Sequence, residues 1–273
     1  MEDCDLHIHT TYSDGLLSPE EVVRKARELN LKAIAIADHD AVGAIEPAKS
    51  VGETLGVEVV PCVELSCLLA NIDIHLLAYF IDYRNPELLA FLADVQKKRV
   101  ERAKKIIGRL SAQGVKIEVE KVLAAAGGGS VGRPHIAQIL VEEGYANDPN
   151  EAFMKFIGYH CPAYVPKMEI GLKEGVELVK KYKGIPVLAH PGTYPLEMVL
   201  SQAIASGIMG IEVWHPEHSP TQTNYFLSLA KERNLLVTGG SDCHGGRKGR
   251  LLIGEIRISY SYLLELKQAK LPF

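Results

Sequence analysis

Short apolar runs rich in β-branched residues alternate along the chain with stretches whose apolar positions recur at helical spacing. The runs predict strands at 4–9, 33–37, 57–65, 72–80, 185–190, 210–215 and 234–240. The first helix is predicted to begin after Ser18, where Pro19 and Glu21 complete a capping box, and to end near Asn30. Seven strands separated by helices predict a parallel, barrel-like α/β fold.

The alternation stops between 86 and 163. A long polar helix beginning near Pro86 is followed by a glycine run at 127–129 and by further short helices. We therefore expect a barrel built from 1–85 and 164–273, with 86–163 as a helical insertion covering the mouth of the active site. The basic cluster at 97–105 within it is typical of a solvated helix face, although contact with phosphates stays an alternative.

The composition favours one large domain carrying this insertion. The 273 residues lie near the roughly 250 of a (β/α) barrel, and 47% of them are apolar, which is enough for a buried core. A formal charge of -4 argues against binding duplex nucleic acid, because that mode needs a broad basic face, and leaves room for a small anionic ligand.

The cellular setting is predicted from the cysteines and the N-terminus. Five cysteines without a C-x-x-C pair are typical of reduced thiols. The start of the chain is acidic where a signal peptide is basic, and no apolar run has the roughly 18 residues that a membrane span needs. We expect a cytoplasmic protein without membrane contact; no pattern in the chain predicts its oligomeric state.

The histidines gather at the ends of predicted strands, where the active sites of (β/α) barrels lie. Seven of the ten occupy such positions: His7, His9, His39, His75, His190, His215 and His244. Carboxylates share this placement, namely Asp14, Asp38, Asp40, Glu64, Glu212 and Asp242. Mixed imidazole and carboxylate ligands suit Zn²⁺, Mn²⁺ or Fe²⁺ better than Ca²⁺ or Mg²⁺.

Each of these residues also has an ordinary structural explanation. His75 alone is typical of a hydrogen-bonded core histidine, Glu64 of a salt bridge, and Asp14 before Gly15 of a turn. The features nevertheless recur at the same end of successive strands, and burying so many ionisable groups without a cation would be costly. We therefore predict a cluster of two to three divalent transition metals.

The chain resembles the polymerase and histidinol phosphatase (PHP) family. The resemblance rests on "HIHTTYSDG", "IADHD", "VELS", "IHLLAYF", "LAHPG", "GIEVWHPEHS" and "GGSDCHG", in the family's order and spacing. It implies a distorted (β/α)7 barrel and a trinuclear site. One metal would be held by His7, His9, Glu64 and Asp242, a second by Glu64, His75 and His190, and a third by Asp14, His39 and His244.

The segment "GGSVGRPHIAQILVEEG" at 128–144 resembles the branch of the family that acts on nucleotides. The resemblance implies hydrolysis of a nucleotide phosphomonoester, foremost a nucleoside 3',5'-bisphosphate, by a hydroxide bridging two metals. A 5'-3' exonuclease acting on short single-stranded RNA or DNA, a histidinol-phosphate phosphatase, a hydrolase of C–N bonds and a non-enzymatic metal-binding interaction domain are the alternatives.

Several cationic groups are candidates for contact with the substrate. Arg133 is predicted to bind the phosphate from a helix start, with His135 as a second contact or a helix cap. His218 is the first choice for protonating the leaving group and His215 the second, either being able to orient a ligand instead. The rim of the mouth is expected to carry Lys167, Arg247, Lys248 and Arg250, or these are solvated loop charges.

Overall fold

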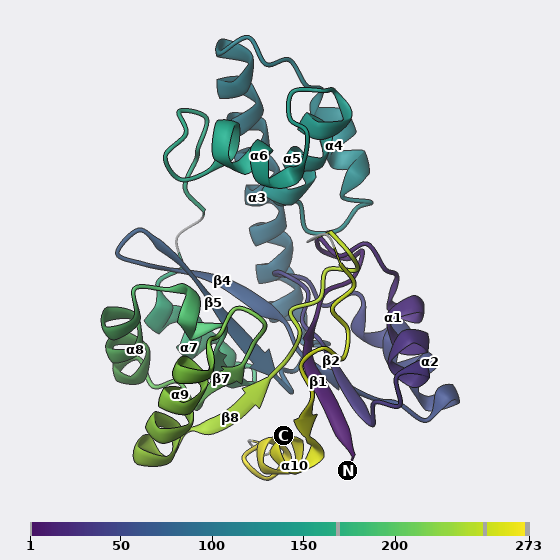
Figure 1. Ribbon diagram of the computed structural model, residues 1–273, viewed down its shortest axis with the longest axis vertical. Helices are drawn as coiled ribbons and strands as arrows, with labels where there is room; N and C mark the ends of the chain where they lie inside the picture. The colour runs from purple at the N-terminus through teal and green to yellow at the C-terminus, as the bar shows by residue number, and fades with distance from the viewer. Residues whose placement is uncertain (1, 168–169, 248–249, 271–273) are drawn as a thin grey trace.

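The computed structural model describes residues 2–167, 170–247 and 250–270. Within these ranges the strands form two sheets (Figure 1). The first has the order β3-β2-β1-β9 and comprises β1 (Asp3–Ile8), β2 (Ala33–Ile36), β3 (Glu58–Pro61) and β9 (Ile258–Ser259). The second has the order β4-β5-β6-β7-β8 and comprises β4 (Glu64–Leu69), β5 (Ile72–Tyr79), β6 (Ile185–Leu188), β7 (Gly210–Trp214) and β8 (Leu236–Gly239).

The two sheets meet through single residue pairs at the ends of their strands. Ile8 at the end of β1 bridges to Cys243 beyond β8, and His39 beyond β2 bridges to Glu64 at the start of β4. Both bridges are parallel. The ends of strands from the two sheets are thereby held next to each other, and the residues at these ends are the histidines and carboxylates noted above.

The mixed α/β class is confirmed, but the prediction of an all-parallel arrangement is wrong. The run at 57–65, predicted as one strand, contains β3 and the start of β4, separated at Cys62 and Val63. β5 pairs antiparallel with both β4 and β6. For β4 and β5 the cause is the two-residue turn at Ala70 and Asn71, which both have positive φ, because a connection this short joins only antiparallel strands.

Helices cover the outer faces of both sheets (Figure 1). They are α1 (Pro19–Glu28), α2 (Ile45–Leu55), α7 (Leu172–Lys181), α8 (Leu196–Ala205), α9 (Pro220–Arg233) and α10 (Tyr260–Gln268). The predicted capping box of α1 is confirmed: Ser18 Oγ accepts from the amide of Glu21, and Glu21 Oε2 accepts from the amide of Ser18. Apolar residues of α1 such as Val22 and Val23 are fully buried in the core.

A helical unit begins with the long helix α3 (Pro86–Ala112) and extends beyond the sheets (Figure 1). Asn85 caps α3 by accepting from the amides of Glu87 and Leu88. The unit continues with α4 (Val119–Ala125), α5 (Arg133–Glu142), α6 (Pro149–Ala152) and a π-helical turn at Phe153–Ile157, and these helices share an apolar core of their own. Across the described residues, none of the helices combines the length and apolar character of a membrane span.

Candidate metal centre

The end of β1 places two imidazoles beside two carboxylates. His7 and His9 are alternate residues, so their side chains lie on one side of the chain, and their Nε2 atoms are 3.2 Å apart. His9 Nε2 lies 3.3 Å from Glu64 Oε2 and 3.1 Å from Asp242 Oδ1. The corresponding distances from His7 Nε2 are 3.5 and 3.6 Å. Four side chains from three distant parts of the sequence therefore converge on one point.

Glu64 directs its other oxygen to a second pair of histidines. Glu64 Oε1 lies 2.9 Å from Nδ1 of His75 on β5 and 3.1 Å from Nε2 of His190, which follows β6. These two imidazole nitrogens are 3.2 Å from each other. Glu64 is only 1% exposed. Its two oxygens thus lie between two neighbouring groups of nitrogen ligands.

A third group forms around Asp14. His244 Nε2 lies 3.4 Å from Asp14 Oδ1, and His39 Nε2 lies 3.9 Å from Asp14 Oδ2. The ring of His9 stacks on that of His244 with 4.1 Å between centroids. Ligand atoms of His9, Asp14, His39 and His244 fall within 4.8 Å of one another, as do those of His7, His9 and Asp242 and those of His39, Glu64 and His75.

The donor atoms of this cluster fit metal cations. Asp14 Oδ1, His39 Nδ1 and Glu64 Oε2 are buried without a hydrogen-bond partner. His39 Nδ1 and Glu64 Oε2 nevertheless lie 2.9 Å apart. Buried polar atoms are rarely left unpaired, because each costs about 1–3 kcal/mol. Unpaired imidazole and carboxylate atoms that converge in this way could hold a divalent metal ion.

Neighbouring charges in the cluster shift the pKa values of its buried side chains. Burial would lower the pKa of His7, but Glu212, Glu64 and Asp242 raise that pKa well above its ordinary value. Burial would raise the pKa of Glu64, but neighbouring histidines, His75 foremost, hold it well below its ordinary value. These carboxylates thus favour a proton on His7, and a metal cation bound to His7 would compete with that proton.

Glu212 on β7 fixes two of the candidate ligands. Its Oε1 lies 3.0 Å from His7 Nδ1, and its Oε2 accepts from the amide of His190 at 2.7 Å. Glu212 is fully buried. A carboxylate that accepts from Nδ1–H leaves Nε2 of His7 as the free lone pair, directed at Glu64 and Asp242. The sequence showed Glu212 only as a carboxylate inside an apolar strand, and its role depends on pairing across the sheets.

Asp38 and Asp5 hold the loops that present the ligands. Asp38 accepts from the amide of Thr10 at 2.8 Å and from its hydroxyl at 2.7 Å, which shapes the turn leading to Asp14. Asp5 accepts from the amide of Ser241 at 2.8 Å, which places the residue before Asp242. Burial raises the pKa of Asp5 to about 6. These two aspartates support the cluster without taking part in it.

The two histidines expected to serve as acids differ in their surroundings. His218 Nδ1 donates to the carbonyl of Val213 at 2.9 Å, and its Nε2 accepts from the amide of Gly192 at 3.0 Å. Both of its ring nitrogens are therefore engaged with backbone. His215 accepts from the amide of Glu217 at Nδ1, and its Nε2 lies 3.4 Å from Asp242 Oδ2. His215 therefore faces the cluster.

Arg133 lies at the first turn of α5 in a cage of aromatic rings. Its guanidinium is 4.8 Å from the centre of the Tyr159 ring and 5.4 and 5.5 Å from those of Tyr164 and Phe153. Nη1 donates to the carbonyl of Ile157 at 3.3 Å. None of these rings was singled out in the sequence, because they follow Arg133 by 20 residues or more.

The other predicted substrate contacts are divided between the site and the surrounding structure. Lys167 Nζ lies 2.8 Å from His75 Nε2, beside the cluster. His135 accepts at Nδ1 from the amide of Gly132 and so caps α5, the alternative considered for it. Arg247 donates to the carbonyl of Asp14 and to Gln138 Oε1, which ties the Asp14 loop to α5.

Arg250 and Lys248 complete the predicted rim. The Arg250 side chain is 67% exposed and pairs with Glu255 at 3.0 Å, which is the solvated loop charge considered as its alternative. Lys248 lies outside the described residues. Among the three rim residues that the structure describes, Lys167 is the one that lies next to the histidines.

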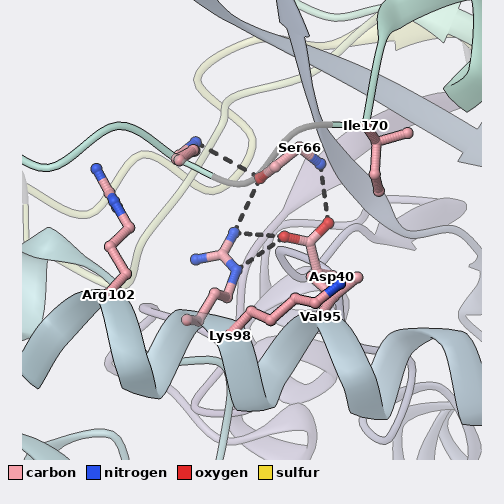
Figure 2. Close-up of a pocket in the computed structure, with 8 residues that line it drawn as sticks. Asp40, Ser66, Val95, Lys98, Arg102 and Ile170 are labelled. Carbon is pink, nitrogen blue, oxygen red and sulfur yellow. Dashed lines mark hydrogen bonds and ion pairs between the residues drawn. The ribbon is translucent and has the colours of Figure 1, made fainter.

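A second network links the cluster to α3 (Figure 2). The carboxylate of the fully buried Asp40, which follows His39, accepts two hydrogen bonds from Arg99 of α3, at Nε and Nη2. Arg99 also donates to Ser66 Oγ at 2.9 Å, and the amide of Ser66 donates to Asp40 at 2.8 Å. Arg102, one turn further along α3, lines the same small pocket. This network fixes the helical unit on the strand ends.

Comparison with known proteins agrees with this geometry. Residues 5–108 match the model of the PHP domain. The chain is 33% identical to the 5'-3' exoribonuclease Rnm of Escherichia coli over 88% of this chain and 84% of the relative. It is 29% identical to the 3',5'-nucleoside bisphosphate phosphatase of Chromobacterium violaceum over 93% and 91%.

A solved structure from Bifidobacterium adolescentis, of a protein assigned as a metal-dependent phosphoesterase, superposes with a TM-score of 0.91. It is 32% identical in sequence, and the match covers 99% of this chain and 97% of the other. The resemblance extends over the helical unit as well as the sheets.

Proposed function

This chain belongs to the PHP family and is a metal-dependent phosphoesterase, and we propose that it hydrolyses a phosphomonoester of a nucleotide, foremost a nucleoside 3',5'-bisphosphate. The observation that carries this proposal is the position of Arg133. It lines a pocket of about 460 Å³ together with His75 and Lys167, so the pocket opens directly beside the cluster. Such a pocket is within the range that small ligands occupy, and guanidinium suits phosphate recognition.

We propose that two to three divalent transition metals occupy the cluster. Their ligands are His7, His9, Asp14, His39, Glu64, His75, His190, Asp242 and His244. When bound, such cations polarise phosphoryl oxygens and bring the pKa of water near neutrality. Glu64 would be shared between two of these metals, because each of its two oxygens lies within 3.5 Å of a different set of histidines.

The chain's own cations hold the phosphate and orient it. Arg133 and Lys167 approach from the helical unit and from the segment that follows it. Lys167 Nζ lies 2.8 Å from His75 Nε2, and both residues line one pocket with Arg133. The negative charge on the oxygens of a phosphomonoester in this pocket is compensated by Arg133 and Lys167.

We propose that His215 stabilises the leaving oxygen by donating a hydrogen bond to it from Nε2–H. Because Nδ1 of His215 accepts from the amide of Glu217, the neutral ring carries its proton on Nε2, which faces Asp242. His218 holds no spare proton while it donates to Val213 and accepts from Gly192. His218 is therefore a positioning residue for the loop that carries His190.

The proposal also includes how the two sheets and the insertion together form the site. We infer that the two sheets act together as one distorted barrel formed by 1–85 and 164–273, joined at the bridges of Ile8 and His39. The insertion at 86–163 covers the mouth of this barrel. It contributes Arg133 to the site and is held there by the ion pair between Arg99 and Asp40.

A 5'-3' exonuclease acting on short RNA or DNA is the second candidate. A groove along α3 favours it, because Lys98, Arg102, Lys105 and Lys167 all line this groove next to the proposed site. A row of cations of this kind suits the phosphates of a single strand.

A parallel activity screen tests the proposal. Adenosine 3',5'-bisphosphate, short 5'-phosphorylated RNA and histidinol phosphate are offered with Mn²⁺, and phosphate or nucleotide release is measured. We expect the highest kcat/KM for the bisphosphate. Asp14→Ala and His9→Ala should abolish turnover while circular dichroism stays that of the folded protein. Preference for histidinol phosphate, or full activity in both variants, would overturn the proposal.

A further inference from the structure

The pocket beside His75 has walls that do not belong to the metal cluster. It lies between the turn of the β4–β5 hairpin at Asn71, the segment with Tyr159 and His160, and the segment at Tyr194. Asp73 also lines it. Asp73 and His75 are alternate residues of β5, so both side chains leave the same face of the strand. The pocket therefore continues from the cluster toward Asp73.

Asp73 has one oxygen engaged and one unpaired. Its Oδ2 accepts from the hydroxyl of Tyr159 at 2.9 Å and lies 3.7 Å from Arg133 Nη2 and 4.0 Å from Lys167 Nζ. Its Oδ1 is buried and has no hydrogen-bond partner, and the residue is only 8% exposed. An acceptor in this state, on the wall of a pocket, is suited to a donor on a ligand.

Tyr159 adds an aromatic surface to the same pocket. Tyr159 is 51% exposed, although it lies beside Arg133 and Tyr164. The guanidinium of Arg133 lies over the ring, and the ring of Tyr164 is 5.0 Å away at an angle of 44°. Its orientation is therefore fixed by Arg133, Tyr164 and the hydrogen bond to Asp73. A rigid, exposed ring of this kind can stack on a nucleobase.

We propose that this pocket binds the nucleoside part of the substrate. The base stacks on Tyr159, and Asp73 Oδ1 accepts a hydrogen bond from a hydroxyl or amino group of the nucleoside. This inference rests on the function proposed above and names the part of the enzyme that distinguishes nucleotides from other phosphomonoesters. Arg133 connects the two halves of the site, because it touches both Tyr159 and Asp73 while lying beside the phosphate position.

The competing explanation is that Asp73 serves only to neutralise Arg133 and Lys167. Neutralisation requires the oxygen that lies near those two cations, which is Oδ2. Neutralisation of the two cations explains neither why Oδ1 is unpaired nor why Tyr159 is exposed. The two explanations also differ in consequence, because a purely structural carboxylate does not distinguish one nucleoside from another.

The test compares substrates as well as variants of the full-length, metal-loaded protein. Wild type, Tyr159→Leu and Asp73→Ala are assayed with adenosine 3',5'-bisphosphate and with glycerol 2-phosphate, which has no ring. For Tyr159→Leu we expect the ratio of the two kcat/KM values to fall about tenfold. The matched controls are Tyr225→Leu, another exposed tyrosine, and Asp94→Ala on α3, and neither should change the ratio.

Substrate analogues identify the group that donates to Asp73. The 2'-deoxy analogue lacks a ribose hydroxyl, and purine riboside 3',5'-bisphosphate lacks the amino group of adenine. In wild type, one of the two should lose about tenfold or more in kcat/KM relative to the adenosine compound, and this loss should disappear in Asp73→Ala. The comparison of the analogues with wild-type protein remains a test even if Asp73→Ala fails to fold.

The outcomes separate this inference from the function on which it rests. Equal kcat/KM for all three bisphosphates in wild type would overturn the hydrogen bond to Asp73. An unchanged ratio in Tyr159→Leu would overturn the stacking. Absence of hydrolysis of every phosphomonoester by metal-loaded wild type would instead overturn the proposed function itself.

Discussion

Replacing Glu212 by glutamine tests a residue that holds two proposed metal ligands, His7 and His190, in place without being a ligand itself. The change keeps the size and shape of the side chain and removes one acceptor. Glu212 now accepts twice, from His7 Nδ1 at 3.0 Å and from the His190 amide at 2.7 Å. Glutamine offers one oxygen and one NH₂ group, so one of these two partners must face a donor instead of an acceptor.

The size of the effect follows from which partner is lost. If the oxygen stays with the His190 amide, the NH₂ group donates to His7 Nδ1, which favours the tautomer that carries its proton on Nε2. That nitrogen then presents a proton to Glu64 and Asp242 in place of a lone pair. If the amide turns round, the backbone that carries His190 loses its anchor. Changes of this kind cost about 10- to 100-fold in metal affinity or activity, which corresponds to about 1.4–2.7 kcal/mol.

The assay is a competition between the protein and a chelator for Zn²⁺, combined with kcat/KM for p-nitrophenyl phosphate. Glu217→Gln is the matched control, because it makes the same chemical change five residues away on an exposed side chain. We expect weaker metal binding and lower activity in Glu212→Gln alone, with an unchanged circular dichroism spectrum. Wild-type metal affinity and activity in Glu212→Gln would refute the reasoning.

Three further predictions concern packing, thiol chemistry and metal removal. A Cβ on Gly240 would lie 2.4 Å from the Cβ and the backbone nitrogen of His7, so Gly240→Ala should displace His7, cost about 1–3 kcal/mol of stability and reduce activity. Gly108→Ala is the control, because the space around Gly108 is open. Equal melting temperatures for the two variants would contradict this prediction. In the native protein Ellman's reagent should react with Cys161, the half-buried cysteine, while the four buried thiols react only on unfolding; rapid labelling of more than one thiol would count against the packing. Removing metal with a chelator should lower the melting temperature, because ligands of the folded state stabilise it; calorimetry showing no shift would argue against bound metal.

Much of the arrangement of strands and helices was predictable because it depends on local patterns. The strands at β1, β2 and β5 through β8 are short apolar runs, and the start of α1 is a capping box. The division of 57–65 between β3 and β4 was missed, because Cys62 and Val63 are as apolar and as buried as the strands they separate. The hairpin turn was missed too, since Ala70 is not a residue that signals positive φ.

The part of the site formed by histidines and carboxylates at successive strand ends was predictable from the sequence. The part that depends on contacts between distant segments was not. The alternation of His7 and His9 fixes their common direction in the sequence itself. The role of Glu212 requires the positions of both His7 and His190, and the aromatic cage of Arg133 requires the fold of the segment around Tyr159. Ion pairs such as that of Asp40 with Arg99 belong to the same class, because they join residues 59 positions apart.

The most direct test of the account is to measure metal content and phosphate release on the same sample. Protein stripped by a chelator is titrated with Mn²⁺, Zn²⁺ or Fe²⁺, and hydrolysis of adenosine 3',5'-bisphosphate is followed at each step. We expect no turnover in the stripped protein and recovery of activity as two to three equivalents bind per chain. Full turnover by the metal-free protein, or binding of metal without any recovery of activity, would contradict it.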